Sequence, residues 1–305
     1  MEKPLVLGID IGGSHITAAL VNLETRKIIL ASYRRRFVDS SDGADILIES
    51  WCDVINEAFE GSNITERIMG IAMPGPFDYV NGICLIKEQG KFQSLYKVDV
   101  KTELAERLNI LPCNIGFIND AAGFLQGEVF AGAARNFGKS LGITLGTGLG
   151  SALHLNGVAS DAALWDSDFL GGIAEDYLST RWFIKRYEEL SGRLLVGVKD
   201  LLALVKTDPN SALVFREFGH NLGRFISPLI KQHHLELVII GGNISLAFNA
   251  FSAALEAALK AEQLTVAIKI TTLQENAALI GAASCLDQQV NSKGGFDYPY
   301  AIKND

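Results

Sequence analysis

Glycine-rich turns beside carboxylates are the parts of this sequence best suited to chemistry. The run Asp10-Ile11-Gly12-Gly13-Ser14 places a carboxylate directly before two glycines and a hydroxyl. Glycines in such a turn let backbone N–H groups approach a phosphate closely, and Ser14 adds another donor. Asp10 could hold Mg²⁺ directly or through its waters. An ordinary β-hairpin with glycines at positive φ explains the same residues.

A second glycine turn, Gly146-Thr147-Gly148, stands between two apolar segments, 140–145 and 149–155. Its glycine spacing superficially resembles a dinucleotide-binding fingerprint. That fingerprint needs a helix after the turn, whereas the residues that follow here are strand-like. A strand–turn–strand phosphate clamp fits better, and the similarity of the two turns suggests an internal duplication.

Polar residues and glycines also follow two other apolar segments. Asn119 and Asp120 end the segment 114–120. In α/β folds, ligands bind at the carboxyl ends of strands, so Asp120 could act as a general base toward a substrate hydroxyl. A plain helix N-cap would look the same in the sequence. Gly241 and Gly242 precede a predicted helix, where an anion or a flat ligand could bind, and a tight turn is the alternative.

These residues depend on strands and helices that the apolar pattern predicts. Strands are expected over 5–11, 16–20, 27–37, 68–74, 114–120, 140–145, 149–155, 235–245 and 266–273. Helices are expected over 45–59, 98–108, 121–133, 174–190, 201–233 with a break near Asp208-Pro209, 247–262 and from about 275 onward. Such alternation indicates an α/β architecture with a partly parallel sheet. We expect the polar tail Asn291–Asp305 to be poorly ordered.

Length and composition restrict the class of protein. A chain of 305 residues with 48% hydrophobic and 20% charged residues is expected to form about two globular domains. Its 27 basic and 35 acidic residues give a net charge of -8, which disfavours nucleic-acid binding. No apolar run reaches the roughly 18 residues of a membrane span, and no signal peptide is recognised. The cysteines form no CxxC pair, so free thiols and a cytoplasmic location are expected; they are Cys52, Cys84, Cys113 and Cys285.

Several motifs occur together in one order: DxGGS, PGPxD, ND, LGTGxG, GGN and ENAALIGAA. As a set they resemble the ROK family of sugar kinases, within the actin–hexokinase–Hsp70 ATPase superfamily. The resemblance covers roughly residues 5–285. It implies an α/β fold of two related ribonuclease-H-like (actin-like ATPase) domains with a central cleft that closes on ATP and a sugar. We expect domains over 1–118 and 119–285, and the last helix, about 286–300, is a candidate to pack on the first.

The resemblance also implies a role for each motif residue. Asp120 would be the catalytic base that accepts the proton of a sugar hydroxyl. Sugar binding is implied for Asn119, Asp120 and Glu175. ATP and phosphate binding is implied for Asp10, Gly12, Gly13, Ser14, Gly146, Thr147, Gly148, Gly241 and Gly242, with Asp10 also on the Mg²⁺ side.

The sequence departs from the family in one segment. Family members usually carry ExGH and CxCGxxGCxE motifs after the second phosphate loop, and this chain has neither. Zinc is therefore not expected. Glu175 matches the glutamate at the end of the cysteine motif, and Asp166 and Asp168 are candidates to fill the remaining space, unless they belong to a surface loop.

Three functions remain open from the sequence. The leading one is ATP-dependent phosphorylation of a hexose or related sugar, in which Asp120 is the base. The alternatives are a sugar- or nucleotide-binding regulator of the same fold and a kinase for a non-hexose acceptor. The expected partners are ATP with Mg²⁺ and a small sugar, with no nucleic acid and no membrane. A homodimer is compatible with the family, and the sequence does not identify the sugar.

Overall fold

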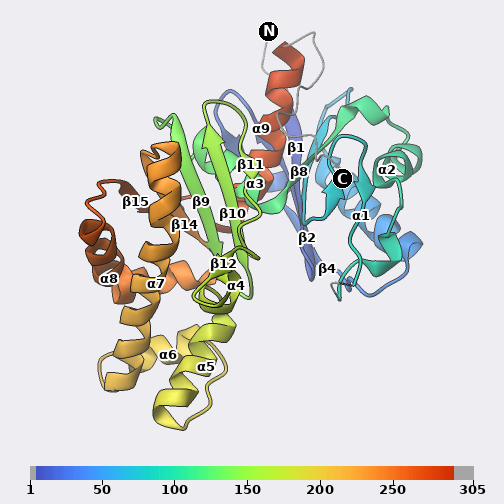
Figure 1. Cartoon of the computed structure of the whole chain (residues 1–305). Coiled ribbons are helices and arrows are strands. Elements are labelled where there is room, and N and C mark those ends of the chain that lie inside the picture. Colours follow the sequence, from blue (N-terminus) through green and yellow to red (C-terminus); the bar gives the residue numbers. More distant parts are fainter. Residues whose placement is uncertain (1–4, 89, 292–305) are drawn as a thin grey trace, which may run out of the picture. The chain divides into compact units, whose positions relative to one another are not determined.

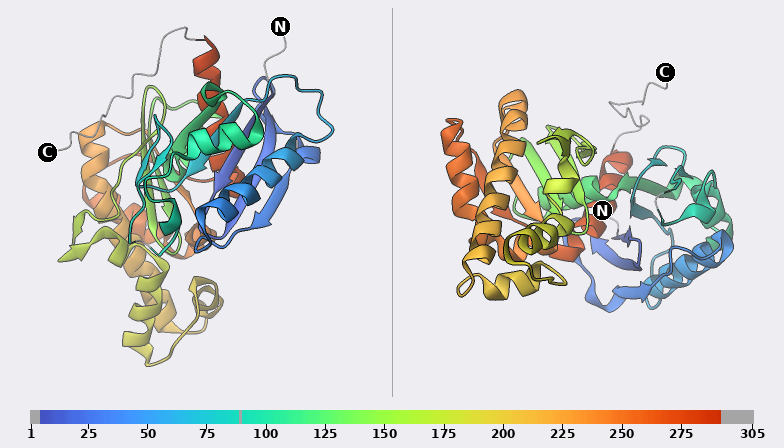
Figure 2. Two further views of the ribbon diagram at one scale, coloured as in Figure 1. Left: turned by 90° about the vertical axis from the view of Figure 1, so that its right-hand side faces the viewer. Right: turned by 60° about the horizontal axis from the view of Figure 1, so that its bottom comes forward.

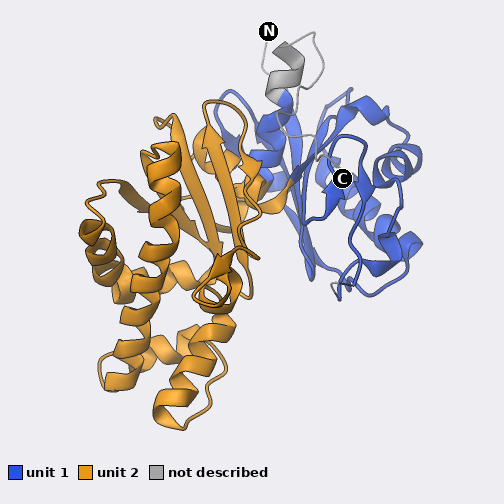
Figure 3. Ribbon diagram, viewed as in Figure 1, with its two compact units in different colours: residues 1–118, 279–305 blue, residues 119–278 orange. Residues whose placement is uncertain are grey.

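The structure is a computed structural model that describes residues 5–88 and 90–291. Its contacts divide the chain into two compact units, Met1–Ile118 with Leu279–Asp305, and Asn119–Ala278 (Figure 3). The tail that we expect to be poorly ordered lies outside the described residues from 292 onward. The same holds for the second half of the helix predicted over about 286–300.

The first unit is built on a mixed sheet with the strand order β3-β2-β1-β5-β8, in which β4 also pairs with β2. Its strands are β1 (Leu5–Ile11), β2 (His15–Asn22), β3 (Lys27–Ile28), β4 (Arg34–Phe37), β5 (Met69–Met73) and β8 (Ile115–Asn119). A separate hairpin pairs β6 (Phe77–Asp78) with β7 (Ile83–Cys84). β1 pairs antiparallel with β2 and parallel with β5, so the first glycine turn closes the hairpin at one end of the central strand.

The second unit repeats this arrangement. Its sheet has the order β11-β10-β9-β14-β15. The strands are β9 (Lys139–Leu145), β10 (Leu149–Leu155), β11 (Ser160–Asp161), β14 (Leu237–Gly241) and β15 (Ala267–Ile270). β9 pairs antiparallel with β10 and parallel with β14, as β1 does with β2 and β5. The duplication suggested by the two glycine turns is thus visible as a shared strand order, and the α/β prediction is confirmed.

Helices of the first unit cover its sheet with apolar faces. α1 (Ala44–Phe59) lies along one face of the sheet (Figure 2), and its residues Leu47, Trp51 and Ile55 are fully buried because a spacing of four repeats on one helix face. Ile46, although apolar, is 60% exposed and lies outside this buried face. α2 (Val100–Leu108) begins at Asp99, whose carboxylate accepts a hydrogen bond from the first turn at 2.9 Å.

The second unit is rich in helices. They are α3 (Asp120–Phe130), α4 (Ala174–Tyr177), α5 (Thr180–Ser191), α6 (Val198–Leu204), α7 (Pro209–His233) and α8 (Phe248–Ala261). α7 and α8 lie side by side against the second sheet (Figure 1). Phe218 of α7 packs on Phe183 of α5 and Phe251 of α8, with ring centroids 4.4 Å and 5.1 Å apart. This aromatic cluster ties the three helices to one core.

α9 (Ala277–Asn291) packs unusually close to the first sheet. A Cβ added to Gly8 on β1 would lie 2.2 Å from the backbone oxygen of Leu279, and one added to Gly70 on β5 would lie 2.0 Å from that of Ala282. Neither backbone oxygen can move without moving the helix. These glycines therefore allow a helix to rest directly on the strands of the sheet.

Three expected elements differ from the sequence prediction. The strand expected over 235–245 ends at Gly241, and a 3-10 helix follows over Asn243–Ala247. The single strand expected over 27–37 is interrupted by a 3-10 turn at Leu30–Ser32, because the Ser32 hydroxyl donates to Ile29 O at 2.7 Å and accepts from Leu20 N at 2.8 Å. The N–H of Leu20 on β2 thus bonds to a side chain instead of a backbone carbonyl, and the strand is interrupted at this point. The single helix expected over 174–190 is split into α4 and α5, because the chain becomes extended at Ser179.

One helical stretch, Asn243–Ala261, is long and apolar enough to cross a membrane by length and composition. It combines a 3-10 helix, Asn243–Ala247, with α8. Phe251, Leu255 and Leu259 of this stretch are buried in the core of the second unit. Its apolar face therefore serves the packing of that unit.

Candidate functional site

The first glycine turn projects from the hairpin between β1 and β2. Asp10 is half-buried near the end of β1 and is paired with strands on both sides. The turn closes through a hydrogen bond from Gly12 N to His15 O at 2.9 Å. Gly13 and Ser14 are exposed, and the Ser14 hydroxyl shares a hydrogen bond with His15 Nδ1 at 2.9 Å. The predicted phosphate-binding residues of the first unit thus lie together beside one carboxylate.

The second glycine turn closes in a similar way. Gly146 N donates to Gly148 O at 3.0 Å, and Thr147 at the tip is exposed. The carbonyl oxygen of Gly146 accepts two hydrogen bonds from Thr180 at the start of α5, from N at 2.8 Å and from Oγ1 at 2.9 Å. The turn is therefore anchored to a helix that follows it by more than thirty residues in the sequence.

Glu175 on α4 anchors the other side of the same turn. Its Oε2 accepts a hydrogen bond from Leu149 N at 3.0 Å, and its Oε1 accepts one from Arg181 Nη2 at 2.6 Å. A Cβ added to Gly148 would lie 2.6 Å from Glu175 Oε2, so a larger residue at this position would displace the carboxylate. The residue that the resemblance places at the sugar thus contacts the second glycine turn in this structure.

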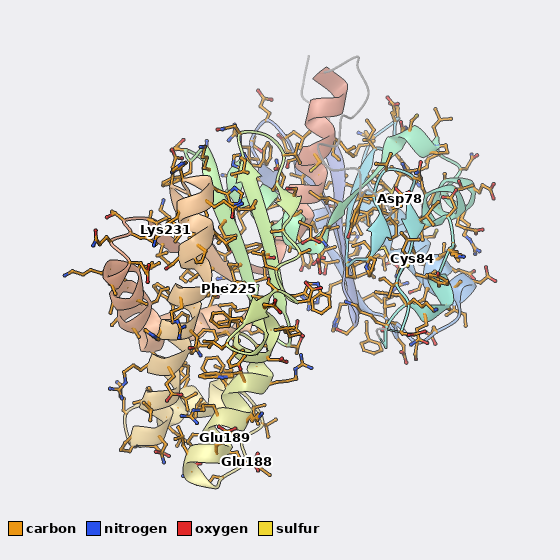
Figure 4. All side chains as sticks on the ribbon, in the orientation of Figure 1. Asp78, Cys84, Glu188, Glu189, Phe225 and Lys231 are labelled. Atoms are coloured by element: carbon orange, nitrogen blue, oxygen red, sulfur yellow. The ribbon has the colours of Figure 1, made fainter. Side chains whose placement is uncertain are left out.

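The segment that carries Glu175 is held by aromatic packing and backbone pairing. A hairpin of β12 (Asp168–Phe169) and β13 (Gly172–Ile173) precedes α4. The ring of Phe169 packs edge-on against Tyr177 and Phe225, with centroids 5.6 Å and 5.4 Å apart. Figure 4 labels Phe225, which extends from α7 toward this hairpin. Glu175 N donates to the backbone oxygen of Trp165 at 3.0 Å.

Asn119 and Asp120 divide two tasks at the start of α3. Asn119 is buried, and its Oδ1 accepts hydrogen bonds from Ala121 N at 2.9 Å and Ala122 N at 3.1 Å, so Asn119 is the helix cap. Asp120 is the first helical residue and is exposed, with Oδ1 2.8 Å from Ala121 N. The sequence left open whether Asp120 caps the helix, and the structure gives that task to Asn119.

Asp161, on β11, is a neighbour of Asp120 that the sequence reasoning missed. Loss of hydration raises the pKa of the Asp161 carboxyl; a hydrogen bond from Ala163 N opposes the rise, and the negative charge of Asp120 adds to it. The available signal was its position in the repeated topology. Asp161 lies on β11, which follows the second glycine hairpin as β3 follows the first. Thr180 and Arg181 were also missed, since both stand inside a helix that the sequence predicts without interruption.

Gly241 and Gly242 lie beside the second glycine turn. Gly241 ends β14 and pairs with Thr144 of β9. Gly242 has a φ of 77°, and a Cβ there would lie 2.3 Å from the backbone oxygen of Leu145. Only glycine combines that backbone angle with this approach. The strand–helix turn is therefore tight, and it brings the predicted nucleotide residues next to the predicted phosphate turn.

The remaining candidates do not form a metal site. Across residues 5–88 and 90–291, no three His, Cys, Asp or Glu side chains cluster as metal ligands would. Asp166 and Asp168 are exposed, and Asp168 begins β12. Burial raises the pKa of the Cys52 thiol to about 11 and that of Cys285 to about 12, so both are protonated at neutral pH and poor ligands.

Comparisons with known proteins agree with this fold. The sequence profile of the ROK family matches residues 6–161, just over half of the chain. A glucokinase of Thermotoga maritima is 25% identical, over 95% of this chain and 99% of its own. An N-acetyl-D-glucosamine kinase of Pectobacterium atrosepticum is 24% identical, over 78% and 83%.

Solved structures show the same architecture. A ROK hexokinase from Thermus thermophilus superposes with a TM-score of 0.78 at 20% identity, covering 94% of this chain and 99% of that one. A ROK family glucokinase from Streptomyces griseus, in complex with glucose and AMPPNP, gives 0.72 at 21% identity, covering 93% and 100%. Each unit therefore has the ribonuclease-H-like topology of the actin-like ATPases. Together with the profile match, this shows that the chain belongs to the ROK family.

Proposed function

We propose that this protein transfers the terminal phosphoryl group of ATP to a hydroxyl of a hexose or a related sugar. The observation that carries the proposal is the division of tasks at the start of α3, where Asn119 caps the helix and the exposed carboxylate of Asp120 is not needed for capping. The relatives named glucokinase and N-acetyl-D-glucosamine kinase support the reaction class, as does the complex of the Streptomyces griseus enzyme with glucose and AMPPNP.

Asp120 would act as a general base on the sugar. As the sugar oxygen attacks the γ-phosphorus, its proton passes to the Asp120 carboxylate, the bond to the β–γ bridging oxygen breaks, and ADP leaves. Asn119 and Glu175 are the other side chains that we assign to the sugar, and Glu175 already uses both carboxylate oxygens within the protein. A sugar hydroxyl that binds Glu175 must therefore share it with Arg181 or Leu149.

Backbone amides would hold the phosphates. The two glycine turns present N–H groups, which carry no net charge, so a chain with a net charge of -8 can bind an anionic nucleotide. We assign the adenosine to the Gly241-Gly242 turn, which lies next to the second glycine turn.

Mg²⁺ fits the donor set of the first turn. It prefers oxygen ligands and is usually bound by one or two carboxylates together with substrate phosphates. The half-buried carboxylate of Asp10, beside exposed Ser14, supplies such a ligand. When bound, the ion neutralises charge that develops on the phosphate oxygens. We propose no zinc site, because the sequence carries neither the ExGH nor the CxCGxxGCxE motif.

Release of ADP from MgATP over a panel of hexoses and N-acetylhexosamines tests this proposal. We expect turnover with at least one sugar and a loss in kcat of about 10²- to 10⁴-fold in Asp120→Asn, with little change in KM for the sugar. Asp200→Asn is the matched control, because Asp200 is an exposed carboxylate in the first turn of another helix of the same unit. Stabilisation by a sugar without ADP release would indicate a binding protein, and full activity of Asp120→Asn would refute the assigned base.

A further inference from the structure

Thr180, the first residue of α5, forms hydrogen bonds to the second glycine turn. Thr180 donates both its backbone N–H and its hydroxyl to the carbonyl oxygen of Gly146, at 2.8 Å and 2.9 Å. A carbonyl with two donors at these distances has both lone pairs in use and a fixed direction. Thr180 is half-buried, so water competes only partly for the same oxygen.

The direction of this carbonyl determines where the next amide points. The bond between Gly146 and Thr147 is trans, because the only cis bond in the described chain is Gly75-Pro76. In a trans peptide the C=O and the following N–H point in opposite directions. When Gly146 O is held against α5, the N–H of Thr147 is therefore directed away from α5, toward the open side of the turn.

Two other backbone N–H groups at the turn already donate to protein acceptors. Gly146 N donates to Gly148 O, and Leu149 N donates to Glu175. Within the described chain, the N–H groups of Thr147 and Gly148 have no protein acceptor. Two adjacent unpaired amides at an exposed turn form a concave donor site for an oxyanion. The donors left for a phosphate are thus the two whose orientation depends on the Gly146 carbonyl.

A flip of this one peptide would reverse the electrostatics of the turn. Rotation of the Gly146–Thr147 peptide would replace a donor by a carbonyl oxygen that repels a phosphate. Glycine offers little steric resistance to such a rotation, and a Cβ added to Gly146 would meet no atom within 4 Å. The turn alone does not prevent the flip, whereas two hydrogen bonds from α5 oppose it.

We propose that Thr180 is a positioning residue for nucleotide binding: by holding the Gly146 carbonyl, it aims the Thr147 amide at a phosphate of ATP. The inference rests on the proposed function, because it requires that the second glycine turn receive phosphate. Thr180 itself touches neither the nucleotide nor the sugar in this role. Its effect is expected in nucleotide affinity and in the mobility of the turn, and not in sugar affinity.

Calorimetric binding of Mg·AMPPNP to four proteins tests the inference. Thr180→Val removes the hydroxyl at nearly constant volume and should weaken binding about 5- to 10-fold, the effect of one hydrogen bond. Thr180→Ser keeps the hydroxyl and should bind within about twofold of the wild type. Thr207→Val is the matched control, since Thr207 also donates to a backbone carbonyl, that of Leu204, in a different loop.

Amide hydrogen exchange of peptides that cover residues 145–150 gives a readout without ligand. Thr180→Val should exchange faster there than the wild type, and Thr180→Ser should not. Equal nucleotide affinity of Thr180→Val and wild type would overturn the inference, and so would an equal loss in Thr180→Ser, which would indicate packing instead of the hydroxyl. If Thr180→Val does not fold, Thr180→Ala removes the hydroxyl without adding bulk against the turn.

These outcomes separate the inference from the proposed function. If the wild type binds Mg·AMPPNP but phosphorylates no sugar, the proposed reaction fails and the Thr180 variants still decide the inference. If the wild type binds no nucleotide, the inference falls with the phosphate-binding part of the proposal. If ADP is released but Thr180→Val changes only the KM for the sugar, the positioning role is wrong while the reaction stands.

Discussion

Removal of the negative charge of Glu128 should destabilise the second unit. Glu128 is fully buried in α3. Its carboxylate accepts hydrogen bonds from threonine hydroxyls and backbone N–H groups. Its Oε1 accepts from Thr271 Oγ1 at 2.5 Å, Thr272 N at 2.9 Å and Leu273 N at 3.0 Å. Its Oε2 accepts from Ala133 N at 2.7 Å and Thr272 Oγ1 at 3.2 Å. This carboxylate therefore ties α3 to the loop that follows β15.

The cost of Glu128→Gln follows from this geometry. The amide oxygen of glutamine can replace Oε1, but its NH2 group then takes the place of Oε2 and faces the N–H of Ala133, donor against donor. The loss of a charge-assisted hydrogen bond and the unpaired amide together cost about 3 kcal/mol. Glu128→Ala leaves every one of these donors without its carboxylate acceptor and should cost about 5 kcal/mol or more.

Calorimetric melting and native-state hydrogen exchange measure this effect. A loss of about 3 kcal/mol corresponds to a drop in Tm of about 6 to 12 °C for a unit of this size. In Glu128→Gln, amide hydrogen exchange should be faster than in the wild type in peptides that contain residues 271–276. Glu256→Gln, at an exposed glutamate on α8, is the matched control and should melt like the wild type. A Glu128→Gln protein that melts within 2 °C of the wild type would refute the argument.

Two further predictions concern close packing and buried thiols. Gly70→Ala should lower the free energy of unfolding by about 2 to 4 kcal/mol in urea titrations, because its Cβ would lie 2.0 Å from the backbone oxygen of Ala282; a cost under 0.5 kcal/mol would contradict the contact. In the native protein at pH 8, a thiol reagent should modify the exposed Cys113 and not Cys52. Burial raises the pKa of Cys52 from 9.0 to about 11. The contribution of the protonated thiol to the free energy of unfolding is therefore complete below pH 9 and is lost as the pH rises toward 11. Cys52→Ala should lose less stability between pH 8 and pH 10 than the wild type, and an equal loss would show that Cys52 does not titrate as described.

Local sequence patterns predicted the elements that depend on local chemistry. The break at Asp208-Pro209 is a clear case, because the Asp208 side chain caps α7 and Pro209 occupies its first turn. The two glycine hairpins are another, since alternating apolar residues and a glycine turn specify a hairpin without information from the rest of the chain. The resemblance to the family added the expected ligands of these turns, which spacing alone does not provide.

The differences arise where distant residues decide the local structure. The interruption of the strand over 27–37 depends on a hydrogen bond from Leu20 N to the Ser32 hydroxyl, which the local pattern of residues 27–37 does not reveal. Splitting of the helix over 174–190 accompanies the bonds from Thr180 to Gly146, which join residues far apart in the sequence. The anchors of the second glycine turn are therefore the part of the site that sequence patterns could not supply.

The segment between β11 and α5 lacks the cysteine motif that is usual in the family, and aromatic and backbone contacts restrain it instead. A zinc site stabilises a short segment by cross-linking it through thiolate and imidazole ligands. Here the edge-on contacts of Phe169 with Tyr177 and Phe225, and the bond from Glu175 N to Trp165 O, restrain the same stretch. Because these contacts fix α4, they also fix the carboxylate that binds Leu149 N beside the second glycine turn. Aromatic packing in this segment is thus coupled to the geometry of the second glycine turn through Glu175.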